Sequence, residues 1–285
     1  MVRRSVMFTP GDRPEMMRKA PSAGADVIVF DLEDAVAPAK TADARAAVRT
    51  VLTEPAFDPD CEVCVRINAD SASARDDLDA LFAAESAVRL DSLMLPKVES
   101  AADVRDVAVK LEARDVHIPI FALIESASGV LDAAEIAAVP ATDALVFGAE
   151  DFAADVGARR TREGIEVLYA RERVVVAAAA HGCDAIDTVF TDFGDEAGLR
   201  EETSFAIQLG YDGKLAIHPA QVAPINDAFT PDADELEWAE TVLEAKREAD
   251  DDGRGVFEVD GEMIDAPLIA QAERIVRRAD AADDS

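Results

Sequence analysis

Eight short apolar runs alternate with alanine-rich amphipathic stretches, and this alternation restricts the fold more than any other feature of the chain. The runs are rich in Val, Ile, Leu and Phe, as is typical of strands buried on both faces. They cover residues 5–10, 26–33, 61–68, 92–97, 118–126, 144–150, 184–189 and 214–219. Helical patterns lie between them, for example at 38–52, 100–114 and 169–182. Eight alternations in roughly 220 residues predict an α/β fold, a (β/α)8 TIM barrel. A doubly wound open sheet is the main alternative, but no glycine-rich phosphate fingerprint follows the first run.

The rhythm changes after residue 219. A polar helix is predicted over 232–249, a short extended segment with a turn at "VDGE" over 255–267, and a final helix over 268–280. Because a barrel closes without this tail, we divide the chain into a catalytic barrel domain, residues 1–230, and a C-terminal helical extension, residues 231–285.

The charge of the chain excludes some partners. The net charge is -31, with 59 acidic against 28 basic side chains, so nucleic acid and anionic membranes would be repelled. No apolar run is long enough to span a membrane, and the N-terminal run is too short for a signal peptide, so we expect a cytoplasmic protein. Only six of the bases are lysines, and the acids are spread along the whole chain. This composition is typical of a halophilic protein, in which salt screens self-repulsion.

Polar residues stand at the same end of all eight runs, where the chemistry of a (β/α)8 barrel lies. A single acid after a strand is usually a helix cap or a solvated loop residue. Polar endings on eight strands are instead expected to meet at one mouth. These endings include Arg13, Glu33, Asp34, Arg66, Asn68, Lys97, Glu125, Glu150, Asp151, Asp187 and His218.

Glu125 and Asp151 follow neighbouring runs, so their carboxylates are expected to lie close together. Two carboxylates at short range repel each other unless a proton or a cation lies between them. No cysteine or histidine cluster is near them in the pattern, and oxygen-only sites favour a hard ion such as Mg²⁺. The sequence therefore predicts a Mg²⁺ site, with Mn²⁺ as the alternative metal.

The cysteines and histidines carry less information. Cys61 and Cys64 have the spacing of a redox or zinc pair, but no second pair exists, and core packing is the better interpretation. His117 and His181 are expected to be solvated. For His218 a structural hydrogen bond and a catalytic role both stay open.

The motifs of the chain resemble the HpcH/HpaI aldolase and citrate lyase β-subunit superfamily, specifically its malyl-CoA lyase-like branch that acts on CoA thioesters. The resemblance covers nearly the whole chain, with "IES" standing where the family more often has "IET". The matching segments are "FTPGDRPEMMRKA", "GADVIVFDLEDAVAPAKTADAR", "VRIN", "LPKVES", "IPIFALIESASGVL", "VFGAEDFAADVG", "AIDTVFTDFGDEAGLREE", "GYDGKLAIHPAQV" and "GVFEVDGEMIDAP".

The resemblance implies a (β/α)8 barrel in a homotrimer or hexamer, with the C-terminal extension lying as a lid over a neighbouring subunit's active site. It implies that Glu125 and Asp151 hold Mg²⁺ and that Arg66 contacts a small oxo-acid. Asp265, in "MIDAP", would be the catalytic acid/base delivered by the adjacent subunit.

The resemblance also implies where CoA binds. Phe8, Arg13, Lys19 and Lys40 fall in the family's CoA-facing region, and Arg66 completes the substrate contacts. Glu33 and Asp34 would lie behind the metal and the arginine. Basic side chains, scarce elsewhere, are present in this part of the chain, where CoA phosphates need them.

The implied function is a Mg²⁺-dependent carbon–carbon lyase that cleaves or forms a 3-hydroxyacyl-CoA such as malyl-CoA or β-methylmalyl-CoA, with an oxo-acid and an acyl-CoA as the other side of the reaction. Alternatives within the family are a citryl-CoA lyase (citrate lyase β subunit), a citramalyl-CoA lyase, a malyl-CoA thioesterase and a malate synthase. A subunit that works only inside a larger complex with acyl-carrier and transferase partners is another alternative. An aldolase of sugar acids fits the basic residues at 13–40 less well.

Overall fold

The structure is a computed structural model that describes residues 2–83, 88–251 and 256–283. The chain divides into two compact units. The barrel unit comprises Arg3–Asn226, and the C-terminal unit comprises Asp227–Ser285 with Met1–Val2. Each unit has a hydrophobic core of its own.

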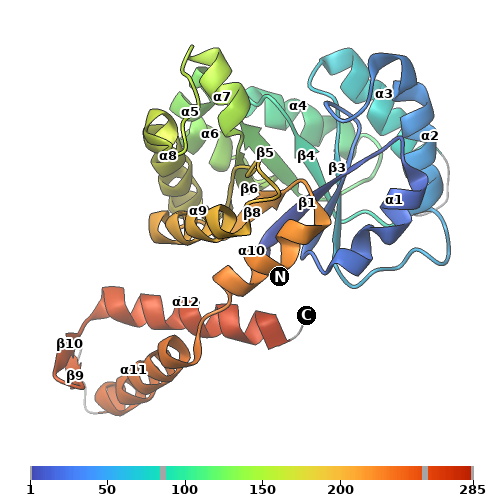
Figure 1. Ribbon diagram of the computed structural model, residues 1–285. Helices are drawn as coiled ribbons and strands as arrows, with labels where there is room; N and C mark the ends of the chain where they lie inside the picture. Colours follow the sequence, from blue (N-terminus) through green and yellow to red (C-terminus); the bar gives the residue numbers. More distant parts are fainter. Residues whose placement is uncertain (1, 84–87, 252–255, 284–285) are drawn as a thin grey trace. The chain divides into compact units, whose positions relative to one another are not determined.

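Eight parallel strands close into a barrel in chain order, with the last strand paired to the first (Figure 1). This confirms the (β/α)8 barrel predicted from the alternation. The strands are β1 (Ser5–Pro10), β2 (Val27–Asp31), β3 (Glu62–Arg66), β4 (Ser92–Leu95), β5 (Ile120–Ile124), β6 (Thr142–Phe147), β7 (Asp184–Asp187) and β8 (Gly213–Ala216).

Helices follow the strands and cover the outside of the barrel (Figure 1). The α-helices are α1 (Pro14–Lys19), α2 (Thr41–Leu52), α3 (Ser71–Leu81), α4 (Ala101–Glu112), α5 (Ala127–Leu131), α6 (Ala133–Ala137), α7 (Ala149–Asp155), α8 (Ile165–His181), α9 (Glu196–Leu209) and α10 (Val222–Phe229). Three short 3₁₀ helices are η1 (Ala20–Ala23), η2 (Pro38–Lys40) and η3 (Pro219–Gln221).

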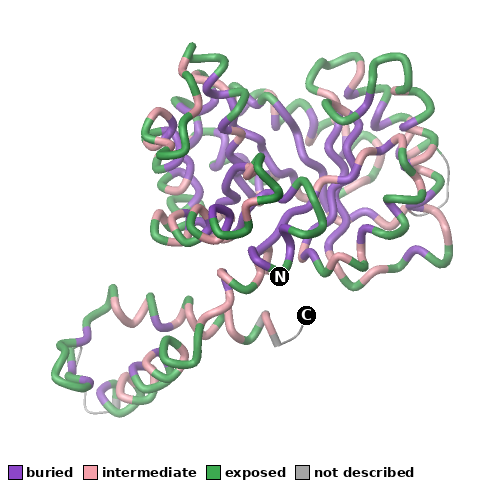
Figure 2. The backbone as a smooth tube through the Cα atoms, in the orientation of Figure 1, coloured by how far each residue is buried: buried purple, intermediate pink, exposed green. Residues whose placement is uncertain are grey.

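The strands of the barrel are buried along most of their length (Figure 2). Their apolar side chains, among them Val29, Cys64, Phe121 and Val146, form the core. A packed interior of this kind leaves the polar chemistry to the strand ends. Cys64 is fully buried and all three cysteines are free, so core packing is confirmed for this thiol.

The end of the sixth predicted run is wrong. The sequence places a strand up to residue 150, whereas β6 ends at Phe147 and α7 begins at Ala149. Glu150 and Asp151 therefore lie in the first turn of a helix. The physical reason is that acidic side chains stabilise the first turn of a helix, where backbone N–H groups lack partners.

The C-terminal unit consists of α11 (Ala233–Asp251), a hairpin of β9 (Phe257–Val259) and β10 (Glu262–Ile264), and α12 (Ala266–Asp283). Asp260 and Gly261 make the hairpin turn with φ values of 50° and 86°. A two-residue turn with positive φ at both positions favours Asp-Gly, which confirms the turn predicted at "VDGE". Gly255, where the predicted extended segment begins, lies outside the described residues.

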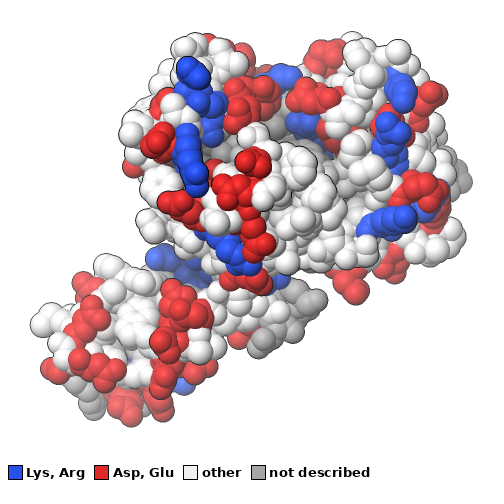
Figure 3. Space-filling model, viewed as in Figure 1, with Lys and Arg blue, Asp and Glu red and all other residues white. Residues whose placement is uncertain are grey.

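Acidic side chains are distributed over both units (Figure 3). Within the described residues, no helix combines the length and apolar character that crossing a membrane requires.

Candidate functional site

Glu125 is a buried carboxylate at the C-terminal end of the barrel. It follows the last residue of β5, and only 6% of the residue is exposed. The backbone N–H of Lys97 donates a hydrogen bond of 2.8 Å to Oε1 of Glu125. The end of β4 thus orients the carboxylate that follows β5.

Gly148 leaves the space that the other carboxylate oxygen occupies. Ile124 and Phe147 are register partners, and the Gly148 amide donates 3.0 Å to the Ile124 carbonyl. A β-carbon at position 148 would lie 2.7 Å from Oε2 of Glu125. Glycine is therefore required here by the close approach of a side chain, not by its backbone angles.

The surroundings of Glu125 oppose its ionisation. Burial and the negative charges of Asp151 and Glu33 raise the pKa of Glu125 to about 8, against the Lys97 hydrogen bond and the charge of Arg66. Asp151 itself is exposed, in the first turn of α7. The charge of Asp151 thus contributes to the raised pKa of Glu125.

Arg66 ends β3 and is held by three carboxylates. Its Nε and Nη2 donate 2.7 and 2.6 Å to the two oxygens of Asp31, a bidentate pair. Its Nη1 lies 3.2 Å from Glu33 Oε2 and 3.5 Å from Asp34 Oδ2. Burial alone would lower the pKa of Arg66, but these ion pairs outweigh it and the pKa lies above its ordinary value.

Sequence reasoning missed Asp31, the main partner of Arg66. Asp31 is 1% exposed and also accepts hydrogen bonds from the amides of Glu33 and Ala35. The signal in the sequence is that both strands end in a charged residue, and the structure adds that Asp31 and Arg66 are register partners. An acid and a base that end adjacent parallel strands are expected to pair.

Glu33 connects Arg66 to Lys97. Oε1 of Glu33 accepts 2.7 Å from the Lys97 ammonium, and its side chain is 9% exposed. Burial raises the pKa of Glu33, although Lys97 and Arg66 pull it down. Oε2 of Glu33 is buried and, among the described residues, receives no hydrogen bond in good geometry.

These observations fit a hard divalent cation. The donors are carboxylate oxygens only, Gly148 leaves room beside Glu125 Oε2, and the buried Oε2 of Glu33 accepts no well-aligned hydrogen bond although Arg66 Nη1 lies 3.2 Å away. A cation would also offset the burial and the repulsion that together raise the pKa of Glu125. In the described part of the chain no group of three His, Cys, Asp or Glu side chains forms a ready metal cluster, so most ligands of a Mg²⁺ ion here would be water or substrate oxygens.

The residues expected to face CoA differ in burial. Phe8 is half-buried in β1, with the guanidinium carbon of Arg66 4.8 Å from its ring centroid. Arg13, Lys19 and Lys40 are exposed on the segments after β1 and β2. Lys40 Nζ lies 3.3 Å and Arg13 Nε 3.4 Å from the carboxylate of Asp12.

Asp265 is exposed and lies between β10 and α12 in the C-terminal unit. Its carbonyl oxygen accepts a hydrogen bond of 3.0 Å from the Ile269 amide, so its backbone begins α12. Glu125, Asp151 and Arg66 all belong to the barrel unit.

Two of the eight polar strand endings have structural roles. Asp187 is fully buried and pairs with Arg171 and Lys214, both at 2.8 Å. His218 accepts a hydrogen bond of 3.1 Å on Nδ1 from the Ala220 amide and stacks on Phe193. His117 and His181 are exposed, as expected.

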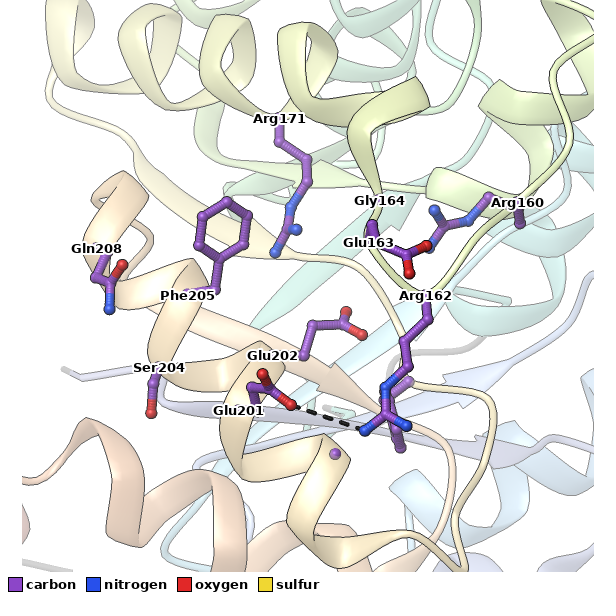
Figure 4. A pocket seen from close by; sticks show the side chains of 12 residues that line it. Arg160, Arg162, Glu163, Gly164, Arg171, Glu201, Glu202, Ser204, Phe205 and Gln208 are labelled. Atoms are coloured by element: carbon purple, nitrogen blue, oxygen red, sulfur yellow. Dashed lines mark ion pairs between the residues drawn. The ribbon is translucent and has the colours of Figure 1, made fainter.

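A cavity of about 700 Å³ lies between α8, α9 and the loop before α8 (Figure 4). None of the site residues predicted from the sequence lines it. Most of its charged side chains are paired: Arg162 with Glu201 at 3.7 Å, Arg171 with Asp187, and Glu202 with Lys214 at 2.9 Å. Glu125 and Arg66 therefore stay the centre of the candidate site predicted from the sequence.

Comparisons with known proteins identify the family of the chain. The chain is 40% identical over 279 residues to the citrate lyase subunit beta-like protein of Deinococcus radiodurans, with 96% of each covered. It is 37% identical to the mitochondrial citramalyl-CoA lyase of Homo sapiens, covering 97% of this chain and 85% of that protein. It is also 37% identical to a (3S)-malyl-CoA thioesterase of Cereibacter sphaeroides, covering 98% and 95%.

A solved structure matches both units of the chain. The protein CitE of Mycobacterium tuberculosis, in complex with magnesium, acetoacetate and coenzyme A, superimposes with a TM-score of 0.81 at 37% identity and 98% coverage of each chain. The model of the HpcH/HpaI aldolase/citrate lyase family matches residues 4–219. The motifs, the barrel and these similarities agree, and the chain belongs to the HpcH/HpaI aldolase/citrate lyase family.

Proposed function

We propose that the protein is a Mg²⁺-dependent carbon–carbon lyase that cleaves or forms a 3-hydroxyacyl-CoA such as malyl-CoA or β-methylmalyl-CoA. The observation that carries the proposal is the buried Glu125 carboxylate, which is exposed to the charges of Asp151 and Arg66, in a chain similar over nearly its full length to a protein solved with magnesium, acetoacetate and coenzyme A. Carboxylates that repel each other next to a fixed guanidinium suit a cation and an oxo-acid together.

Glu125 and Asp151 would hold Mg²⁺, which when bound supplies a positive charge that polarises the oxo-acid carbonyl. Arg66 would contact the oxo-acid carboxylate with the part of its guanidinium that Asp31 leaves free. Glu33 and Asp34 lie near Nη1 of this guanidinium and restrict the direction in which Nη1 can donate hydrogen bonds. The side chains are thus fixed before substrate arrives, which lowers the reorganisation that reaction requires.

In the cleavage direction the substrate hydroxyl loses its proton, the carbon–carbon bond breaks, and its electron pair moves into the thioester as an enolate. Asp265 of an adjacent subunit would act as the general acid/base that exchanges this proton or protonates the acyl-CoA α-carbon. Phe8, Arg13, Lys19 and Lys40 would contact CoA, with the three cations near its phosphates.

The test is a panel of 3-hydroxyacyl-CoA thioesters with separate detection of oxo-acid and free hydroxy-acid. Release of oxo-acid and acyl-CoA from malyl-CoA or β-methylmalyl-CoA is the expected result. Glu125→Gln and Asp151→Asn should abolish this activity and leave the circular dichroism spectrum unchanged. Full activity of the wild type in excess chelator would contradict the metal requirement.

The comparisons favour two alternatives that this panel separates. Similarity to a citramalyl-CoA lyase and to a malyl-CoA thioesterase is equal at 37% identity. Free hydroxy-acid as the product would identify a thioesterase, or a malate synthase if acetyl-CoA and glyoxylate are the precursors. Cleavage of citramalyl-CoA or citryl-CoA alone would identify those lyases. Inactivity on every free CoA thioester would favour a citrate lyase β subunit that needs its complex.

We further propose a homotrimer or hexamer, in which each extension, residues 231–285, lies over a neighbouring barrel. We also propose a cytoplasmic, salt-adapted enzyme, on the strength of its CoA substrate and its charge of -31. Light scattering coupled to gel filtration in molar KCl measures the subunit number directly, and a monomer would contradict the shared site.

A further inference from the structure

Lys97 has a backbone conformation that lysine rarely adopts. Its φ is 52°, in the left-handed region, where a β-carbon is unfavourable. The residue follows Pro96 directly after β4, and its N–H donates to Oε1 of Glu125 at 2.8 Å. Strained backbone of this kind persists where the surrounding structure fixes it, and it is enriched at functional sites.

The side chain of the same residue points to the other half of the site. The ammonium donates 2.7 Å to Oε1 of Glu33 and lies 3.9 Å from Asp34. Glu33 in turn places Oε2 3.2 Å from Nη1 of Arg66. One residue therefore contacts Glu125 with its backbone and reaches Arg66 through one carboxylate.

We propose that Lys97 is a positioning residue that sets the distance between Glu125 and Arg66. Its left-handed backbone aims the Glu125 carboxylate, and its ammonium holds Glu33 against the substrate-facing edge of Arg66. The assignment rests on the proposed function, because it takes Glu125 as a metal carboxylate and Arg66 as the oxo-acid contact.

The two contacts predict that the backbone of Lys97 affects metal binding, whereas its side chain affects oxo-acid binding. Methionine in Lys97→Met tolerates the positive φ as well as lysine does, but it lacks the ammonium that binds Glu33. Lys97→Gly releases Glu33 as well and tolerates positive φ better than any other residue. Lys97→Val also loses the ammonium, and its branched β-carbon resists positive φ. Lys97→Arg keeps a cation for Glu33.

Asp115 offers a matched control for strain. It is the residue after α4 and its turn, with a φ of 57°, and its side chain is fully exposed. Asp115→Val imposes the same backbone conflict as Lys97→Val at a position that contacts neither Glu125 nor Glu33.

Two binding measurements test the proposal without relying on turnover. Mn²⁺ affinity is measured by electron paramagnetic resonance. Oxo-acid affinity is measured by calorimetry in saturating Mg²⁺, with pyruvate as an analogue of the glyoxylate that cleavage of malyl-CoA releases. We expect Lys97→Met and Lys97→Gly to bind Mn²⁺ within about twofold of wild type and pyruvate about tenfold more weakly, with Lys97→Arg restoring most of the pyruvate affinity. Lys97→Val should lose about tenfold in Mn²⁺ affinity as well, since left-handed strain opposes the Glu125 contact. Asp115→Val should lower the melting temperature and change neither affinity.

The outcomes separate the Lys97 assignment from the proposed function. Wild-type protein that binds neither Mn²⁺ nor pyruvate would overturn both. If the wild type binds both ligands but Lys97→Val and Lys97→Gly have equal Mn²⁺ affinities, the backbone role is overturned. Lys97→Met equal to wild type for pyruvate would overturn the side-chain role. If Lys97→Val does not fold, Lys97→Ala takes its place against Lys97→Gly, and equal Mn²⁺ affinities of that pair would likewise overturn the backbone role.

Discussion

Arg66 and Asp31 are register partners at the ends of adjacent strands, and their side chains form a bidentate ion pair that is almost fully buried. Two parallel hydrogen bonds fix the plane of the guanidinium, which a single point charge cannot do. The direction in which Arg66 offers its remaining N–H groups is therefore set by the fold before substrate binds.

We expect Arg66→Lys to be almost as damaging to turnover as Arg66→Ala, because an ammonium cannot satisfy both oxygens of Asp31 and still reach the substrate. Both variants leave a buried carboxylate poorly paired, which costs about 3–5 kcal/mol when a partner is removed outright. Steady-state kinetics and thermal melts measure the two effects.

Arg18 provides the control for this substitution. It makes the same two-pronged contact, at 2.9 and 2.7 Å, with Glu54 on the surface. Arg18→Lys should change turnover and stability little, because water and salt screen an exposed ion pair. Near-normal turnover in Arg66→Lys would show that a diffuse positive charge suffices at that position.

Gly148→Ala tests whether the Glu125 carboxylate needs the space beside it. The added methyl group would lie 2.7 Å from Oε2, so the carboxylate must turn away. We expect Mn²⁺ affinity to fall by about tenfold or more, the scale of losses when a metal ligand is misdirected. Gly194→Ala is the control, since its β-carbon would meet only Asp192 Oδ1 at 3.5 Å. Unchanged Mn²⁺ affinity in Gly148→Ala would remove Glu125 from the metal site.

The Arg66–Asp31 pair and Lys97 show which parts of the site the sequence could predict. The presence of polar residues after the apolar runs was predictable from periodicity, but the exact end of β6 was not, because Glu150 and Asp151 belong to the first turn of α7. The partner of Arg66 was not, because a buried Asp31 inside "VIVFD" looks like the last residue of a strand, and only the register assigns its partner. Lys97 was placed at the mouth, but its positive φ depends on tertiary contacts with Glu125. The intrinsic backbone preference of lysine does not favour a positive φ.

Glu166 predicts a pH dependence for the loop before α8. Burial opposes the shift, but hydrogen bonds from the amide and hydroxyl of Thr161 and from Arg160 lower the pKa of Glu166 to about 2. The folded pKa lies below the unfolded value of 4.5, so this stabilisation is present above pH 4.5 and is lost as the pH falls towards 2.

The measurement is the difference in melting temperature between wild type and Glu166→Gln across pH 3–7. Glu166→Gln should melt lower near neutral pH, and the gap should narrow below about pH 4.5. The adjacent exposed Glu163→Gln should show no such gap. A gap that is constant across the range would show that Glu166 contributes through its shape and not through its charge.

The charge of -31 predicts that the enzyme needs salt. The Debye length grows from about 3 Å at 1 M to about 30 Å at 0.01 M, so distant acids repel each other in dilute buffer. We expect the melting temperature and the fraction of oligomer to rise with KCl. A melting temperature equal in dilute buffer and in molar KCl would contradict salt adaptation.

The local environment of Asp265 does not by itself indicate the proposed catalytic role. Its backbone begins α12 and its side chain is exposed, which is also what a simple helix cap requires. General acid/base groups contribute about 10²–10⁴-fold to rate. We therefore expect Asp265→Asn to lower turnover by roughly that factor with little loss of CoA affinity, because asparagine caps a helix about as well as aspartate does. Unchanged turnover would reduce Asp265 to a cap.

A mixing experiment decides whether Asp265 serves a neighbouring barrel. Asp265→Asn and Glu125→Gln chains, each inactive alone, are combined and allowed to exchange subunits. If the acid acts across the interface, some sites in the hybrids combine an intact Glu125 from one chain with an intact Asp265 from the other, and activity returns. If Asp265 serves its own barrel, every site carries one lesion and the hybrids stay inactive. Mass spectrometry of the intact oligomers shows that hybrids have formed, so inactivity of demonstrated hybrids would refute the shared site.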